Sequence, residues 1–118
     1  MRLLKLLLIL FVCAAGPAVA GPYEDGVAAY GKDDYATAIR LLRPFADKGN
    51  AGAQLVLGFM YELGQGVPQD YVQAHKWWNL AAAKGDADAV KNRDIVAAKM
   101  TPAQIAEAQK LAREWQPK

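Results

Sequence analysis

The sequence predicts an all-α protein built from short antiparallel helix hairpins. Two observations lead to this fold class. One stretch of the chain repeats itself at a spacing of 36 residues, and apolar residues between the turns recur at helical intervals. A repeat of this length is the size of one helix–turn–helix unit. The 118 residues, 53% hydrophobic and 22% charged, fit one globular domain and exclude a disordered chain.

The first 20 residues have the pattern of a secretory signal peptide. Two basic residues precede an apolar run over 6–15, and the small residues Ala18 and Ala20 predict cleavage before Gly21. The run is too short to cross a bilayer comfortably, and no second run of about 18 apolar residues follows. We therefore expect a secreted, periplasmic protein without a transmembrane anchor.

Removal of this segment changes the charge of the chain. It would leave 12 basic and 12 acidic residues, because both charged residues of the signal, Arg2 and Lys5, are basic. A neutral chain without a basic stripe is not expected to bind nucleic acid. The single cysteine, Cys13, lies inside the signal, so the mature form would have no thiol. In an alternative interpretation Cys13 becomes a lipidated N-terminus, although Val12 is bulkier than the residue that usually precedes such a cysteine.

The repeat is clearest where residues 34–54 align with residues 70–90 without a gap. Eight of these 21 positions are identical, including the Asp-Tyr pairs that begin at Asp34 and Asp70. Four of the eight identities are alanines in an alanine-rich chain, so the alignment depends mainly on the Asp-Tyr and Lys-Gly pairs. We divide the mature chain into a shortened repeat at about 21–50, a full repeat at 51–86, and C-terminal capping helices at 87–118.

Turn and cap residues divide these units into helices. The predicted helices cover about 23–30, 35–47, 51–62, 70–84, 86–99 and 101–115. Asp70 and Asp86 are suitable N-caps, and Thr101 to Gln104 has the pattern of a capping box with proline at the first helical position. Pro44 predicts a kink or an early loosening of the second helix.

Residues 51–85 resemble the Sel1-like repeat. The positions that carry the resemblance are Ala53, Leu57, Gly58, Tyr61, Gly64, Gly66, Ala74, Trp77, Ala81, Ala82 and Gly85. The alanines let backbones approach closely, Leu57 and Trp77 fill the space between hairpins, and the loop glycines supply positive φ. The resemblance implies a short α/α solenoid related to tetratricopeptide arrays and used mostly as a protein-binding scaffold.

Secreted members of this family also suggest a second function. Some brace each repeat with a disulfide and have been linked to β-lactam binding or hydrolysis. The mature chain would have no cysteine, so we do not transfer that activity. A cell-wall or β-lactam-directed hydrolase or binding protein remains the alternative, and a small-ligand or structural envelope protein is a third hypothesis.

The helix over 51–62 is apolar nearly all round, so it is either covered on two sides or binds a partner. In related solenoids the first helix of each hairpin lines the concave surface. The candidate contact residues are therefore Val56 and Phe59, with Asn92 and Ile95 one repeat later. In the alternative interpretation, the last helix folds back over this face.

The polar residues give little sign of catalysis. His75 is the only histidine and has no nearby His or Cys to share a metal, and we expect a structural or solvent-facing role for it. Trp77 and Trp78 are expected in the core, and Asp86, Asp88 and Asp94 as helix caps or surface partners of Arg93. We therefore predict a protein- or peptide-binding module that is not an enzyme and has no cofactor or metal. Its partner and oligomeric state do not follow from the sequence.

Overall fold

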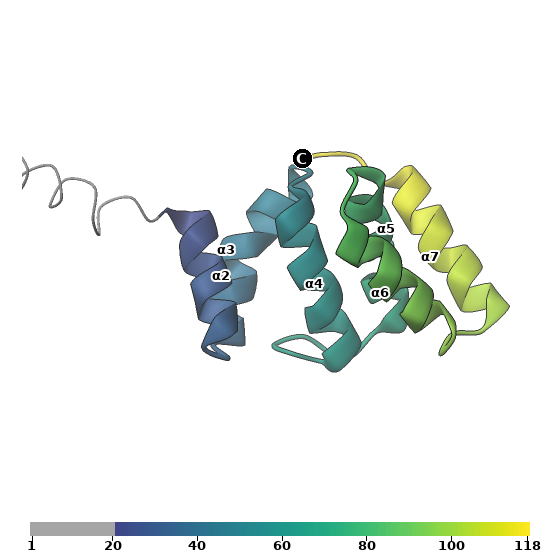
Figure 1. Cartoon of the computed structure of the whole chain (residues 1–118), viewed down its shortest axis with the longest axis horizontal. Helices are drawn as coiled ribbons and strands as arrows, with labels where there is room; N and C mark the ends of the chain where they lie inside the picture. The colour runs from purple at the N-terminus through teal and green to yellow at the C-terminus, as the bar shows by residue number, and fades with distance from the viewer. Residues whose placement is uncertain (1–20) are drawn as a thin grey trace, which may run out of the picture.

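The computed structural model describes residues 21–118, which form six α-helices (Figure 1). These are α2 (Pro22–Gly31), α3 (Tyr35–Asp47), α4 (Ala51–Leu63), α5 (Tyr71–Ala83), α6 (Ala87–Ala97) and α7 (Pro102–Glu114). No strand occurs in residues 21–118, so the predicted all-α class is confirmed. The signal peptide predicted for residues 1–20, with Cys13, lies outside the described residues.

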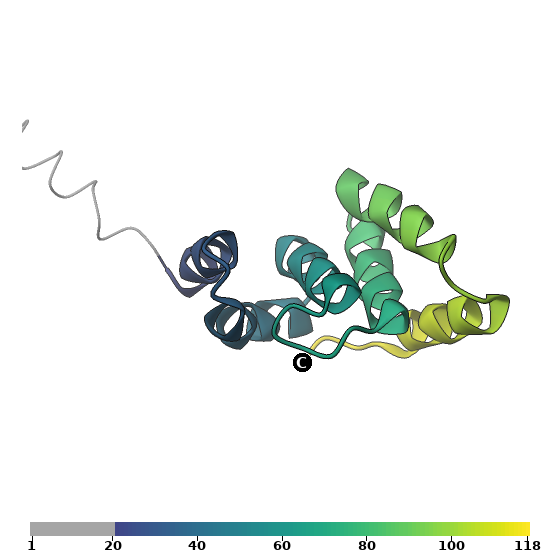
Figure 2. The ribbon, with the colours of Figure 1, turned by 90° about the horizontal axis from the view of Figure 1, so that it is seen from below.

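The helices form two antiparallel hairpins and an end unit. Helix α2 packs on α3 and α4 packs on α5, while α3 joins the hairpins by packing on α4. In Figure 2, α2, α4 and α6 lie on one side of the molecule and α3 and α7 on the other, with α5 between α6 and α7. We refer to α2, α4 and α6 together as the layer of α2, α4 and α6. This arrangement is the short α/α solenoid predicted from the sequence.

Side-chain caps fix where the helices begin. The carboxylates of Asp70 and Asp86 accept hydrogen bonds from backbone N–H groups three residues on, at 3.2 and 2.9 Å. Thr101 and Gln104 form the predicted reciprocal capping box, with bonds of 2.9 and 3.1 Å. Helix α3 continues past Pro44 to Asp47, so Pro44 does not end it. Caps of this kind explain why the predicted boundaries differ from the observed ones by only about one or two residues.

Two buried clusters form the core. Helix α5 contributes buried residues to both, whereas α4 contributes buried residues to the first and half-buried residues that pack against the second. The first contains Ala29, Ala38, Leu42, Ala46, Ala53, Leu57, Met60 and Trp77, and the second contains Ala74, Trp78, Ala81, Ala89 and Val96. Close approach of α4 and α5 requires Gly58, because a Cβ there would overlap the indole of Trp78. The indole Nε1 of Trp78 donates to the carbonyl of Leu55 at 3.0 Å. Trp77 and Trp78 are therefore core residues, as predicted.

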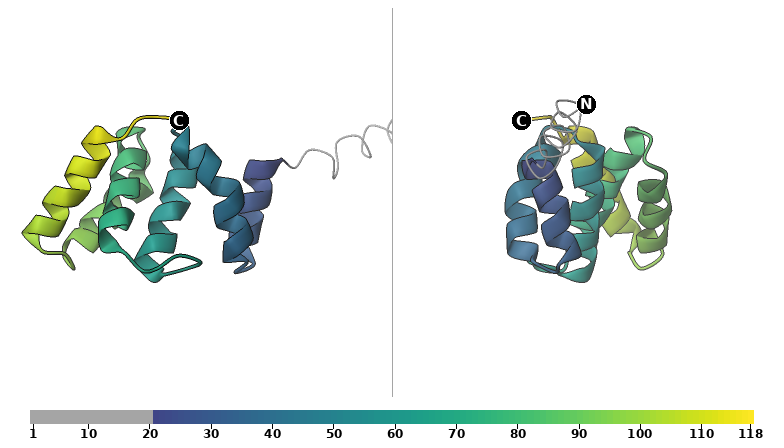
Figure 3. Two further views of the ribbon diagram at one scale, coloured as in Figure 1. Left: turned by 180° about the vertical axis from the view of Figure 1, so that it is seen from behind. Right: turned by 60° about the vertical axis from the view of Figure 1, so that its left-hand side comes forward.

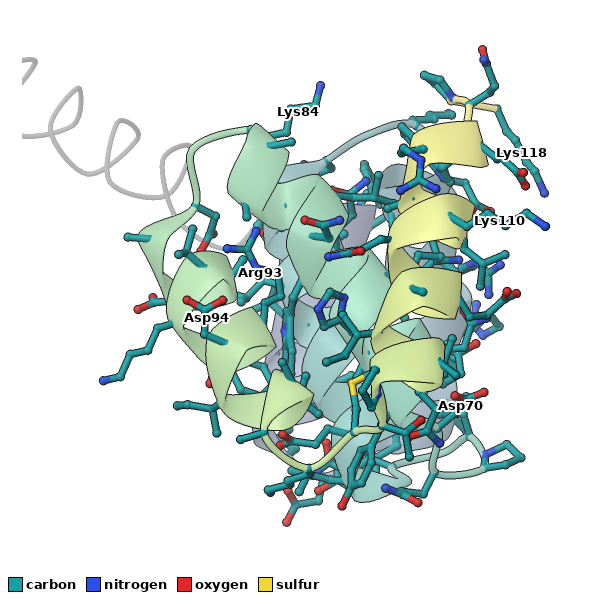
Figure 4. All side chains as sticks on the ribbon, turned by 90° about the vertical axis from the view of Figure 1, so that its right-hand side faces the viewer. Asp70, Lys84, Arg93, Asp94, Lys110 and Lys118 are labelled. Atoms are coloured by element: carbon teal, nitrogen blue, oxygen red, sulfur yellow. The ribbon has the colours of Figure 1, made fainter. Side chains whose placement is uncertain are left out.

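The third unit is more open than the two hairpins before it. Helices α6 and α7 both pack on α5 but make little contact with each other, and they diverge on either side of α5 in Figure 4. The repeat spacing explains this difference, because Arg93 and Asp94 stand one repeat after Leu57 and Gly58. A charged pair in place of Leu and Gly prevents the close packing seen between α4 and α5.

Candidate functional site

The exposed large apolar side chains of the described residues all lie on the layer of α2, α4 and α6. They are Val27 on α2, Leu63 on α4, and Val90 and Ile95 on α6, with exposed fractions of 41%, 58%, 38% and 47%. Helices α3, α5 and α7 carry none. All four therefore lie on the first helix of a repeat or of the end unit.

The four candidate contact residues are placed differently from one another. Val56 is half-buried against the first core cluster, and Phe59 is half-buried with its ring edge-on to Trp78 at a centroid distance of 5.3 Å. Asn92 is also half-buried, and its amide donates to the carbonyl of Asp88 at 2.8 Å. Ile95 is exposed. Ile95 is thus the most exposed of the four candidate contact residues.

The last helix does not produce the covered face considered as an alternative. Helix α7 packs on α5, whereas α4 is covered by α3 and α5 with a small contribution from α6. Phe59 and Val56 are half-buried because of these neighbours.

The glycine-rich loop between α4 and α5 ties the second hairpin to the first. Gly64 and Gly66 have φ values of 67° and 75°, as the sequence predicted. Between them, Gln65 accepts a hydrogen bond from the hydroxyl of Tyr30 at 2.7 Å and donates one to the hydroxyl of Tyr35 at 3.2 Å. A Cβ at Gly66 would lie 2.9 Å from the Cβ of Tyr35. Sequence analysis missed this network, although Tyr30 and Tyr35 flank the loop between α2 and α3 and Gln65 lies in the loop between α4 and α5.

His75 is buried rather than solvent-facing. It is 4% exposed, and its Nδ1 has no hydrogen-bond partner. Burial lowers its pKa, and the positive charge of Arg93 lowers it further. Arg93 itself donates to Asn79 at 3.1 Å and pairs with Asp94 at 3.2 Å. Between residues 21 and 118 no hydrogen bond joins His75 to another side chain, and its imidazole is buried within α5.

The acidic residues considered in the sequence analysis all belong to the start or the surface of α6. Asp86 caps α6, Asp88 lies in its first turn, and Asp94 pairs with Arg93. In the described part of the chain, no group of three or more His, Cys, Asp or Glu residues is placed to hold a metal ion. In the same part, no helix is both long enough and apolar enough to cross a membrane.

A second feature, absent from the sequence analysis, lies at the C-terminal end of the chain. Residues 115–118, which we call the C-terminal strap, run from α7 across the end of α5 to the turn between α3 and α4 (Figures 1 and 3). There the N–H of Lys118 donates to the carbonyl of Asp47 at 2.7 Å. The ring of Trp115 comes within 3.7 Å of the position that a Cβ on Gly49 would take.

Basic side chains gather beside the strap. The guanidinium of Arg43 and the amine of Lys76 lie 5.4 and 4.0 Å from the ring centroid of Trp77. Arg43 also pairs with Asp47 at 3.0 Å. Burial, with added repulsion from Arg43, lowers the pKa of Lys76 to about 8. Among the described residues, the one ion pair that involves these basic side chains is that between Arg43 and Asp47.

Comparison with known proteins identifies the repeats. Residues 19–50 and 51–86 match the family model of the Sel1 repeat. The chain belongs to the Sel1 repeat family. The Sel1-like fold commonly mediates protein–protein interaction.

A solved structure supports the fold of this Sel1 repeat protein. The chain is similar to c5321, a protective antigen present in uropathogenic Escherichia coli strains that displays an SLR fold. The TM-score is 0.74 at 32% sequence identity, and the match covers 80% of this chain but only 21% of c5321. Among curated proteins, none matches the chain.

Proposed function

We propose that this Sel1 repeat protein is exported to the periplasm, where it binds a protein or peptide partner and performs no catalysis of its own. The observation that carries the proposal is the placement of all exposed large apolar side chains of residues 21–118 on the layer of α2, α4 and α6. A partner that covers one such side chain gains about 1.5–3 kcal/mol per fully buried group. The family's common use as an interaction scaffold supports the same function.

The structure favours Ile95 and Leu63 as the residues that test this surface. Both are exposed, so a polar substitution changes the surface without opening a cavity in the core. Phe59 is a less direct probe, because its half-buried ring packs on Trp78. In thermal melts we expect Phe59→Ser to lose some stability, although less than Trp77→Ala, which empties a fully buried site.

Affinity capture from envelope extract tests the proposal. Tagged protein should enrich a partner that is lost with Ile95→Glu or Leu63→Glu but retained with Gln109→Glu, an equal change of charge at an exposed position on α7. Melting temperatures of the three variants establish that each is folded. The same partner captured equally by all variants would remove this layer from the binding surface.

Export is tested separately by intact-mass analysis of envelope material. The proposal requires a mature chain that starts at Gly21, because Ala18 and Ala20 form the cleavage pattern. Retention of residues 1–20, or a lipid attached to Cys13, would contradict it.

A further inference from the structure

Four basic side chains from distant parts of the sequence surround the C-terminal strap, and we call them the strap cluster: Arg43, Lys76, Lys84 and Lys118. Arg43 and Lys76 share the ring of Trp77, and the charge of Lys118 acts on Lys76. The amine of Lys84 lies 3.5 Å from the Cβ position of Gly49, beside the ring of Trp115. The fold thus concentrates positive charge where α3, α5 and the strap meet.

Negative charge within the cluster is limited. The side-chain carboxylates that act on Lys76 are Asp47 and Asp70, and both are already engaged. Asp47 pairs with Arg43, and Asp70 caps α5 by accepting the N–H of Gln73. Three of the four cations therefore have no ion-pair partner among the described residues.

We propose that the strap cluster is a docking site for an acidic polypeptide segment. The carboxylates of such a segment would supply the missing countercharge, and charge complementarity of this kind directs recognition. The strap itself shows that extended backbone fits here, since Lys118 forms a backbone hydrogen bond with Asp47. This surface lies on α3, α5 and the strap, so the inference does not depend on the apolar layer of α2, α4 and α6.

Burial of Arg43 and Lys76 favours a polypeptide over a membrane surface as the occupant. Lys76 is half-buried against Trp77 and Arg43 is partly buried, while Lys84 and Lys118 are exposed. Cations that bind anionic lipid headgroups project from a surface. Burial, followed by repulsion from Arg43, lowers the pKa of Lys76 to about 8. A bound carboxylate would raise this pKa.

Fluorescence anisotropy with labelled octaglutamate as the probe tests the proposal. The purified protein should bind octaglutamate, the affinity should fall as salt is added, and octaglutamine of the same length should not bind. Lys76→Gln and Lys84→Gln should each weaken octaglutamate binding by about fivefold, the effect of losing one partly screened charge pair. In a parallel NMR titration, the pKa of the Lys76 amine should rise when octaglutamate saturates the protein.

Matched controls separate this site from a general charge effect and from the apolar surface. Lys91→Gln removes an exposed cation from α6 and should leave octaglutamate binding unchanged, as should Ile95→Glu. Lys84 is exposed, so its substitution tests the site even if Lys76→Gln alters folding. Equal octaglutamate affinity in the parent protein and both cluster variants would overturn the proposal. Stronger binding to phosphatidylglycerol vesicles than to octaglutamate through the same lysines would overturn it as well.

Discussion

At the scale of single residues, Gly58 sets how closely α4 approaches α5. A Cβ at this position would overlap the ring of Trp78, which is fully buried and held by its bond to Leu55. Gly58→Ala should therefore destabilise the protein by about 1–3 kcal/mol through overpacking, measured by urea unfolding. Gly31→Ala is the matched control, because a Cβ there meets nothing within 4 Å. It should be neutral or slightly stabilising, and equal losses in both variants would contradict the packing argument.

His75 gives the stability a dependence on pH. Its pKa in the folded protein lies below the ordinary value of 6.5, because burial and Arg93 disfavour the charged form. The unfolded chain then binds more protons than the folded chain between these two pKa values. The free energy of unfolding should fall as the pH is lowered through 6.5 and level off below the folded pKa. His75→Gln should remove the part of the pH dependence of the free energy of unfolding that His75 causes. If this pH dependence is unchanged in the variant, groups other than His75 cause it.

Sequence patterns predicted the apolar residues of the core well and its polar residues poorly. Trp77, Trp78 and Ala74 could be placed in the core because they recur on one helix face. Gln54 is equally buried, yet its role depends on a bond from its amide to the carbonyl of Ala46 in the preceding helix. A hydrogen-bond partner in another helix cannot be predicted from the periodicity of apolar residues within one helix.

At the scale of helices, α6 should be less stable than α4. It buries only Ala89 and Val96, whereas α4 buries five residues including Leu57 and Met60. Helices with few buried contacts open more often, so the amides of α6 should exchange with solvent hydrogen faster than those of α4. Hydrogen-exchange mass spectrometry measures this difference. Equal protection of the two helices would show that α6 is held by contacts other than its core residues.

Helix boundaries could be predicted because caps are local, but the angle between helices could not. Asp70 and Asp86 mark the starts of α5 and α6 in the sequence as clearly as in the structure. The open end unit does have a signal, since Asp94 stands one repeat after Gly58. The effect of Asp94 on helix packing can be predicted only when the contact between Gly58 and Trp78 is known.

At the scale of the whole molecule, the basic surface could not be predicted because its members are brought together by the chain's path. Residues 21–118 carry equal numbers of basic and acidic side chains and show no basic stripe, and the residues from Arg43 to Lys118 span most of the fold. They become neighbours because the strap returns from α7 to the α3–α4 turn (Figure 3). Neither net charge nor the local spacing of residues predicts that the C-terminal strap contacts the α3–α4 turn.

The strap should also make the solenoid unfold as one unit. Contacts in a repeat protein usually join only neighbouring units, so an end can unravel without the rest. Here Lys118 bonds to Asp47 and Trp115 lies beside Gly49, which links the last helix directly to the first repeat. Deletion of residues 115–118 should therefore lower the midpoint of urea unfolding and reduce its m-value, because α6 and α7 can then unfold before α2 to α5.

Trp115→Ala should reproduce much of this effect, at a cost of about 1–2 kcal/mol for a half-buried aromatic side chain. Gln116→Ala, at an exposed position in the same strap, is the matched control and should leave the transition unchanged. If the deletion shifts neither the midpoint nor the m-value, the two core clusters must be coupled through α4 and α5 alone. Since side chains of both helices belong to or pack against both clusters, that result would place the cooperativity of the fold in the central hairpin rather than in the strap.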